Sequence, residues 1–311
     1  MPMLIDIAMP EWKTDEAFRA ELAPLLPGAD LRCMDEPGDL SAVTMLATVG
    51  LRPGLATLLP ALRLVQKLGA GVETMVHSPE LPPDVQVARL KSESAAREIA
   101  EYCVAYVLRF QRNMALHEAA QAKARWEPVA PRETPATTVG VLGLGTIGAR
   151  VAAAFAGLGF RVLGWSRGPK DLPGILCRHG AGALRPMLGE CDYVASILPS
   201  TPETRDLADA RFFAAMKPGA VLINAGRGDL VVEADLLAAL DGGHLGGAVL
   251  DVLRAEPLPS GHPLWRHPKV TITPHVSGWR VTGGAADVAE NYRRLSAGRP
   301  PINLVDRGAG Y

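Results

Sequence analysis

A short apolar run leads directly into three closely spaced glycines near the middle of the chain. Residues 138–142 are mostly β-branched or small, and residues 143–148 read Gly-Leu-Gly-Thr-Ile-Gly. A small-residue pattern typical of a helix follows over 149–157. This order predicts a strand, a tight turn and a helix N-terminus, the arrangement with which a Rossmann domain binds a dinucleotide. Without the strand and the helix, the glycines would indicate no more than a turn.

Each glycine of this loop has its own physical reason. Gly143 permits the tight turn, Gly145 lets a pyrophosphate approach the backbone, and Gly148 allows close packing of helix and strand. The first residues of the helix, Thr146 and Ile147, lie where backbone N–H groups are free to bind phosphate. We therefore predict that these five residues bind the cofactor.

The residues after the next predicted strand, 160–165, indicate which dinucleotide binds. An NAD site usually has an acidic residue about 20 positions after the glycines, where it binds the ribose 2′-hydroxyl. Here the chain has Ser166, Arg167 and Lys170, and no acid before Asp171. A serine hydroxyl and two cations suit a 2′-phosphate, so we predict NADP(H). A solvated basic loop would contain the same residues.

Length and composition narrow the class of protein. A chain of 311 residues with 48% hydrophobic residues is expected to form two globular domains. With 32 basic and 33 acidic residues, a nucleic-acid or anionic-membrane partner is not expected. The first residues lack a signal-peptide pattern and no run of 18 apolar residues occurs, which favours a cytoplasmic protein. The four cysteines show no metal-ligand spacing, so we expect free thiols and no metal: Cys33, Cys103, Cys177 and Cys191.

Strand-like and helix-like segments alternate in both halves of the chain, which predicts α/β architecture with two doubly wound parallel sheets. In the second half, a clear helix is expected over 233–240. The expected strands there are 138–142, 161–165, 192–198, 220–224, 246–251 and 270–273. In the first 90 residues we expect strands at 3–8, 42–47 and 62–66 and a helix at 15–22. Ligands are expected at the carboxyl ends of such strands.

The longest helical pattern, over 94–126, predicts a connector between domains. A further helix at 285–295 and an apolar tail at 300–306 are expected to return to the first half. The prediction is therefore a discontinuous, flavodoxin-like substrate domain (1–95 and 286–311), a Rossmann domain (96–285) and a cleft between them. A helix this long is also able to extend past its own domain and pack on a second subunit, which favours a homodimer.

Three predicted strand ends carry groups suited to reducing a ketone. The reduction needs stabilisation of charge on oxygen, a proton donor and an oriented substrate. Arg227 follows the strand 220–224, and a guanidinium is able to hold the carboxylate and carbonyl oxygen of a 2-oxo acid together. His275 follows the strand 270–273 and is a candidate proton donor. Glu256 follows the strand 246–251 and is suited to orient that histidine.

These segments together resemble the D-isomer-specific 2-hydroxyacid dehydrogenase family over essentially the whole chain. Within the family, the similarity is strongest to the glyoxylate/hydroxypyruvate reductase A subgroup, through Trp-Ser-Arg at 165–167 and the ending 305–311. The matching blocks are 69–72, 101–104, 143–148, 198–204, 224–228, 251–259 and 273–275.

The resemblance implies roles for further residues. It implies that Arg227, Glu256 and His275 form the catalytic set, and that backbone N–H groups of Ala70 and Gly71 hold the substrate carboxylate. The cofactor contacts that it implies are Leu198, Pro199, Thr204, Ala225 and Asp251. To these we add Gly278, the glycine of the loop that follows His275. Trp279 joins the predicted substrate site. There it and Arg280 either alter substrate preference or cap the cleft.

The prediction is a reductase that uses NADPH to convert small 2-oxo acids, such as glyoxylate and hydroxypyruvate, to 2-hydroxy acids. His275 acts as the acid, so the rate of reduction is expected to fall as pH rises. Two alternatives stay open: an NAD-linked dehydrogenase of another substrate in the same family, and a dinucleotide-sensing regulator without turnover. A formate dehydrogenase is disfavoured, since that branch has Gln in place of Glu256.

Overall fold

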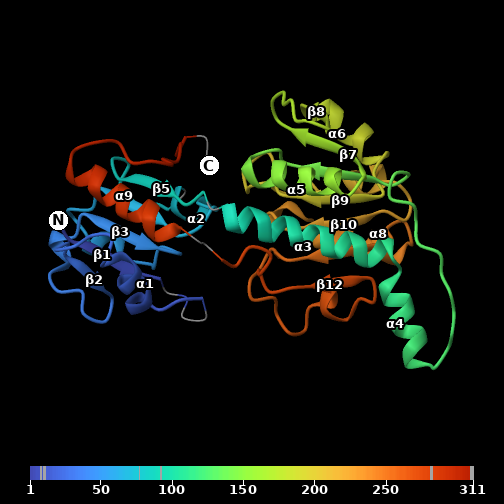
Figure 1. The fold of residues 1–311 in the computed structure, drawn as a ribbon, viewed down its shortest axis with the longest axis horizontal. Helices are drawn as coiled ribbons and strands as arrows, with labels where there is room; N and C mark the ends of the chain where they lie inside the picture. The colour runs from blue at the N-terminus through green and yellow to red at the C-terminus, as the bar shows by residue number, and fades with distance from the viewer. Residues whose placement is uncertain (8, 10–11, 77, 92, 281–282, 309–311) are drawn as a thin grey trace. The chain divides into compact units, whose positions relative to one another are not determined.

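The chain forms two compact units, each built on its own parallel sheet (Figure 1). The computed structural model describes residues 1–7, 9, 12–76, 78–91, 93–280 and 283–308. The first unit comprises Met1–Ser94 and Trp279–Tyr311, and the second comprises Ala95–Gly278. Every pairing between the named strands is parallel, which confirms the predicted fold class of two α/β sheets.

The first unit contains a five-stranded sheet in the order β2-β1-β3-β4-β5. Its strands are β1 (Met3–Asp6), β2 (Leu31–Cys33), β3 (Met45–Thr48), β4 (Leu64–Lys67) and β5 (Gln86–Arg89). Its helices are α1 (Asp15–Leu22), α2 (Glu73–Val76) and α9 (Gly284–Ser296). Apolar side chains of α1 and α9, such as Leu22 and Val288, pack in one cluster with those of β1, so these helices cover the same face.

The second unit contains a seven-stranded sheet in the order β12-β11-β10-β9-β6-β7-β8. Its strands are β6 (Thr138–Leu142), β7 (Arg161–Ser166), β8 (Leu176–His179), β9 (Tyr193–Ser196), β10 (Val221–Asn224), β11 (Gly247–Leu250) and β12 (Val270–Ile272). The helices are α3 (Glu93–Gln111), whose first residues precede the unit, α4 (Met114–Ala122), α5 (Thr146–Gly157), α6 (Ala181–Leu188), α7 (Ala210–Ala215) and α8 (Glu233–Asp241). The strand order reverses between β6 and β9, a place where such sheets commonly bind ligands.

Helices cover both faces of the seven-stranded sheet. Buried residues of α3 and α5, such as Cys103 and Phe155, share one apolar cluster with the sheet. Those of α6, α7 and α8, such as Leu188, Phe213 and Leu236, share the other. This double covering explains why β6, β9, β10 and β11 are buried along their whole length.

The prediction of one continuous helix over 94–126 is wrong for its second half. The helix ends at Gln111, and Asn113 takes a left-handed conformation (φ 54°) before α4 begins. Asparagine tolerates this conformation better than most residues, and its side chain donates to Ala130 O (3.0 Å) in the returning segment. No described residue of α4 is buried, and α4 extends away from the sheet of its unit (Figure 1).

The other predicted elements differ from the structure mainly at their ends. Each predicted strand is present, with ends that differ by at most a few residues. The strand predicted at 42–47 begins at Met45, because residues 40–42 form a 3-10 turn. The prediction omitted β2, β5 and β8, which have three or four residues each. Ala8, at the end of the first predicted strand, and 309–311, in the family-like ending, lie outside the described residues. Within those residues, no helix is both long and apolar enough to cross a membrane.

The chain passes between the units at 94–95 and 278–279. Our predicted boundaries were 95–96 and 285–286. The second crossing comes earlier because Trp279 and Arg280 are already bonded to residues of the first unit. Trp12 Nε1 donates to Trp279 O (2.8 Å), and Ser94 Oγ donates to Arg280 O (3.1 Å).

Candidate active site

The glycine loop joins β6 to α5 at the reversal of strand order. Gly143 has φ 94°, and its N–H donates to Trp165 O (2.8 Å). A Cβ on Gly148 would lie 1.7 Å from Gly143 O, so only glycine allows this packing. A Cβ on Gly145 would meet no atom within 4 Å, so the space beside it is open. Since Thr146 and Ile147 then begin α5, open space and a helix N-terminus coincide, which fits a dinucleotide pyrophosphate.

The basic loop begins at the carboxyl end of the neighbouring strand, β7. Ser166 is the last residue of β7 and is buried, and its hydroxyl donates to Gly168 O (2.7 Å). Arg167 and Lys170 are exposed. The pKa of nearby Glu203 is lowered, chiefly by a hydrogen bond from Thr201 and to a smaller extent by the charge of Arg167. The edge of the sheet at β7 therefore carries the cations that a 2′-phosphate would need.

A closed turn follows β9 on the other side of β6. Thr204 Oγ1 donates to Pro199 O (2.6 Å) and accepts from Thr201 N–H (2.8 Å). Leu198, just before the turn, is buried. In the next loop, Ala225 N–H donates to Ser196 O (3.1 Å), so Ala225 continues the ladder between β10 and β9. The predicted cofactor residues of these two loops therefore lie at the same edge as the glycine loop.

The loop that carries Arg227 is held by a buried asparagine at the end of β10. Asn224 Nδ2 donates to Arg227 O (2.9 Å), and Asn224 Oδ1 accepts from Gly226 N–H (3.2 Å). A Cβ on Gly228 would lie 2.0 Å from the backbone of Leu253, so this loop presses directly on the loop after β11. Asn224 belongs to the block 224–228 that resembles the family, but only the structure shows that its side chain holds this loop.

Glu256 and His275 form the direct pair that the sequence predicts. His275 Nδ1 lies 2.8 Å from Glu256 Oε2, and Glu256 Oε1 accepts from Leu253 N–H (2.9 Å). Burial acts to raise the pKa of Glu256. The bonds from His275 and Leu253, with the charges of His275 and Arg227, outweigh burial and lower that pKa overall. Glu256 is therefore a carboxylate at neutral pH, and Nε2 is the ring nitrogen of His275 that Glu256 does not engage.

Asp251 lies in the same loop system but binds protein groups. It is 1% exposed, and its carboxylate accepts hydrogen bonds from Thr273 Oγ1 (2.6 Å), Val276 N–H (2.9 Å) and Ser277 N–H (2.9 Å). The resemblance implies that Asp251 contacts nicotinamide. In addition, its hydrogen bonds connect it to the segment that carries His275, a role that the sequence did not suggest.

The remaining predicted residues belong partly to the first unit. Ala70 and Gly71 follow β4, and Ala70 O accepts from Arg89 Nη1 (3.3 Å). Trp279 begins the returning segment of the first unit. Gly278 ends the second unit, where a Cβ would lie 2.9 Å from the side chain of Ile99 on α3. The second unit thus brings together the cofactor loops, Arg227, Glu256 and His275, whereas Ala70, Gly71 and Trp279 lie in the first.

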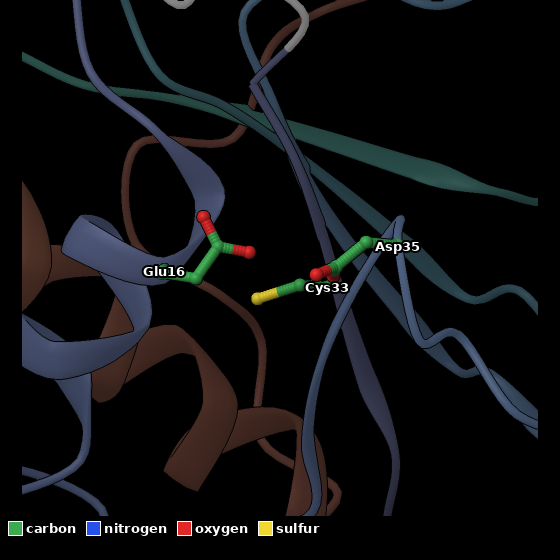
Figure 2. A group of neighbouring side chains, drawn as sticks. All are labelled: Glu16, Cys33 and Asp35. Atoms are coloured by element: carbon green, nitrogen blue, oxygen red, sulfur yellow. The ribbon is translucent and has the colours of Figure 1, made fainter.

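One group of side chains in the first unit has atoms that are able to bind a metal. The ligand atoms of Glu16, Cys33 and Asp35 lie within 4.8 Å of one another (Figure 2). Burial raises the pKa of Cys33 to about 11, so it is a thiol at neutral pH. Both acidic residues are exposed. Exposed carboxylates beside a protonated thiol do not by themselves define a metal centre, and we assign no role to this group.

A glycine loop at the strand-order reversal and a His–Glu pair at the same sheet edge are typical of dinucleotide-dependent dehydrogenases. The family model described as "D-isomer specific 2-hydroxyacid dehydrogenase, NAD binding domain" matches residues 104–277. Glyoxylate/hydroxypyruvate reductase A of Serratia proteamaculans (strain 568) is 37% identical, over 95% of this chain and 96% of its own. The chain therefore belongs to the D-isomer specific 2-hydroxyacid dehydrogenase family.

Solved structures agree with this assignment. A D-isomer specific 2-hydroxyacid dehydrogenase from Xanthobacter autotrophicus Py2, in complex with NADPH and MES, has a TM-score of 0.93 and 39% identity, covering 100% of this chain and 99% of that one. An NADPH-dependent glyoxylate/hydroxypyruvate reductase from Sinorhizobium meliloti, in complex with NADP and sulfate, has a TM-score of 0.91 and 34% identity, with the same coverage. The fold and the family are thus shown over the whole chain.

Proposed function

We propose that this chain reduces small 2-oxo acids, such as glyoxylate and hydroxypyruvate, to 2-hydroxy acids with NADPH. The observation that carries the proposal is the 2.8 Å pair between His275 Nδ1 and Glu256 Oε2 at the sheet edge that bears the glycine loop. Relatives named glyoxylate/hydroxypyruvate reductase, one of them named as NADPH-dependent, support the substrate class.

The proposed roles follow from the chemistry of each side chain. Bound NADPH supplies a hydride. Arg227 holds the substrate carboxylate and stabilises negative charge on the carbonyl oxygen, while His275 delivers a proton to that oxygen from Nε2. The carboxylate of Glu256 keeps the ring oriented and favours its charged form before transfer. Backbone N–H groups of Ala70 and Gly71 are proposed to bind the substrate carboxylate. Trp279 is proposed to contact the substrate.

We propose that the cofactor is held along the carboxyl edge of the second sheet. Ser166, Arg167 and Lys170 would bind the 2′-phosphate, because a hydroxyl and two cations complement its charge. The loop and helix residues proposed for the pyrophosphate are Gly143, Gly145, Thr146, Ile147 and Gly148. The residues proposed for the rest of the cofactor are Leu198, Pro199, Thr204, Ala225, Asp251 and Gly278.

The loss of NADPH absorbance with glyoxylate and hydroxypyruvate, repeated with NADH, tests this proposal. Fast oxidation of NADPH and slow oxidation of NADH are expected. Arg167→Ala should lower kcat/KM for NADPH by about 10- to 100-fold and leave NADH almost unaffected, since one charge-assisted contact is lost. Arg211→Ala, an exposed arginine on α7, is the matched control.

Two outcomes would contradict the proposal. A preference for NADH would overturn the role given to Arg167 and the basic loop. Binding of NADPH without turnover of either acid would transfer the function to another acid or to a dinucleotide sensor on the same fold.

We also propose that the protein is a cytoplasmic homodimer that uses α4 in the interface. Met114 and Leu116 of α4 are 43% and 55% exposed, and Trp126 in the returning segment is 97% exposed. Exposed apolar side chains on and after a helix that extends from its unit are typical of a protein interface. The cysteines at 33, 103, 177 and 191 are free, as expected in a reducing compartment. Sedimentation of a monomer at micromolar concentration would contradict the dimer.

A further inference from the structure

The proposed proton donor has a left-handed backbone conformation. His275 has φ 56°, in the left-handed region that non-glycine residues seldom adopt. Its N–H donates both to Asp251 O (2.9 Å) and to Thr273 O (3.0 Å), so the chain turns tightly around Pro274. A conformation of this kind persists when surrounding contacts determine it. The contacts around His275 therefore decide where its ring points.

Those contacts converge on a buried carboxylate. Asp251 accepts from Thr273, which precedes the turn, and from the N–H groups of Val276 and Ser277, which follow it. Both sides of the turn are thus tied to one rigid point at the end of β11. All three donors are uncharged groups whose hydrogen bonds have fixed directions. The carboxylate of Asp251 is therefore suited to hold the backbone of this turn in one conformation.

A tyrosine on α3 completes the arrangement. Tyr102 Oη lies 2.7 Å from Thr273 Oγ1. Since Thr273 Oγ1 donates its single hydroxyl proton to Asp251, Tyr102 must be the donor to Thr273. Burial raises the pKa of Tyr102, which keeps this proton on the phenol. The proton order is therefore fixed: Tyr102 donates to Thr273, and Thr273 donates to Asp251.

The same helix also supports the far end of the loop. Gly278 packs so closely on Ile99 of α3 that a Cβ there would lie 2.9 Å from the isoleucine side chain. Ile99 and Tyr102 are three residues apart and therefore lie on one face of α3. This face contacts the histidine loop at both ends, at Thr273 and at Gly278.

We propose that Tyr102 and Thr273 are positioning residues for the reduction, which act through Asp251 to hold the loop that carries His275. This inference rests on the proposed function and extends it to two side chains that do not themselves touch the reacting groups. The hydroxyl of Tyr102 fixes Thr273, Thr273 fixes one oxygen of Asp251, and Asp251 fixes the turn. The pairing of His275 Nδ1 with Glu256 depends on that turn.

Removal of single hydroxyl groups tests the proposal in the full-length protein. Tyr102→Phe and Thr273→Val each delete one hydroxyl with little change of shape, and should lower kcat with glyoxylate about tenfold, since small misplacements of a catalytic group are costly. The KM for glyoxylate and the Kd for NADPH should stay within about twofold. The double variant should be no worse than Thr273→Val, because both act through one chain of bonds.

Two matched variants separate positioning from general damage. Thr273→Ser keeps the hydroxyl and should restore kcat to within about twofold of the wild type. Tyr106→Phe removes a hydroxyl one turn along α3, from a ring 4.7 Å away from that of Tyr102. Among the described residues, the Tyr106 hydroxyl makes no hydrogen bond to the histidine loop, so this variant should match the wild type.

Amide hydrogen exchange, measured without substrate, keeps this test independent of the proposed function. The N–H groups of Val276 and Ser277 should exchange slowly in the wild type and at least fivefold faster in Tyr102→Phe and Thr273→Val. Faster exchange in a protein that reduces no 2-oxo acid would overturn the proposed function while keeping the loop restraint. Unchanged exchange and unchanged kcat would overturn the positioning role, as would a Thr273→Ser variant no better than Thr273→Val.

Discussion

Two buried aspartates lie at strand ends in the two units, and their carboxylates have different hydrogen-bond donors. Asp6 ends β1 and is 0% exposed; Arg52 Nε donates to both of its oxygens, at 2.8 and 3.0 Å. Asp251 follows β11 and is 1% exposed, but it accepts from one hydroxyl and two backbone N–H groups. The first fixes its loop with a flexible cation, and the second fixes its loop with short, directional neutral donors.

This difference is reflected in what the two sheet edges carry. Around Asp6, the neighbouring polar groups satisfy one another: Thr48 Oγ1 donates to Gly50 O (2.7 Å), and Lys67 Nζ donates to Val49 O. Around Asp251, the hydrogen bonds hold the loop that carries His275, and Asn224 holds the neighbouring loop that carries Arg227. The second unit's edge therefore carries the proposed catalytic side chains, whereas the proposed contribution of the first unit is the backbone N–H groups of Ala70 and Gly71.

The largest contrast is expected from glycine substitutions in the two strand-end loops. Gly148→Ala places a Cβ 1.7 Å from Gly143 O, whereas Gly69→Ala places one 3.5 Å from the flexible Lys67 side chain. We expect Gly148→Ala to lower Tm by roughly 5–10 °C through steric overlap, and Gly69→Ala to change it little. Differential scanning calorimetry checks both. Equal shifts would mean that the second edge is no more tightly packed than the first.

An intermediate contrast is expected from removal of the two aspartates. Asp251→Ala leaves three donors without their acceptor, so it should cost about 1–3 kcal/mol of unfolding free energy and about 100-fold in kcat. Asp6→Ala leaves Arg52, whose side chain is 48% exposed and therefore hydrated, and should cost less than about 1 kcal/mol. Urea unfolding and NADPH oxidation measure both. The reverse ranking would contradict the distinction between the two edges.

The smallest contrast is in pH dependence. Burial raises the pKa of Asp6 above 3.8 despite the opposing effect of Arg52, so the folded state binds this proton more readily than the unfolded state, and stability from Asp6 falls as pH rises. The pKa of Glu256 lies below 4.5, so its contribution is present at neutral pH and is lost as pH falls through the lowered pKa. The Tm difference between wild type and Asp6→Asn should therefore decrease from pH 4 to 7.

The same measurement with Glu256→Gln should give the opposite slope, with a difference from wild type that grows as pH rises. Both variants keep the size of the side chain and remove its titration. Two slopes of the same sign would contradict the assignment of burial to one carboxylate and of hydrogen bonding to the other.

Local signals in the sequence predicted much of the fold. The apolar run, the glycines and the small-residue helix predicted β6 and α5, and the pattern over 15–22 predicted α1 at its observed bounds. The strands β2, β5 and β8 were missed because they lie at the edges of their sheets and contain polar residues, so no apolar run marks them. The helix break at Asn113 was missed because it depends on a contact with Ala130, far along the chain.

The sequence predicted which residues form the candidate site, but it did not predict which residues hold them in place. Arg227, Glu256 and His275 each follow a strand, so their common edge could be inferred from order alone. The hydrogen bonds that restrain the His275 loop could not be inferred. One of them involves Tyr102, and the position of Tyr102 on its helix predicts burial and nothing more. Its bond to Thr273 joins residues 171 positions apart, a relation that only the packing of α3 on the sheet creates.

The most direct test of the central claim compares wild type with His275→Gln in NADPH-dependent reduction of glyoxylate, with NADPH binding measured in parallel. We expect kcat to fall by about 10²- to 10⁴-fold while the Kd for NADPH stays within about twofold, because a proton donor is lost and the cofactor loops are unchanged. The wild-type rate should also fall as pH rises, because the proposed acid must carry the proton that it delivers. A variant that keeps wild-type turnover would contradict the claim that the His–Glu pair at this sheet edge performs the reaction.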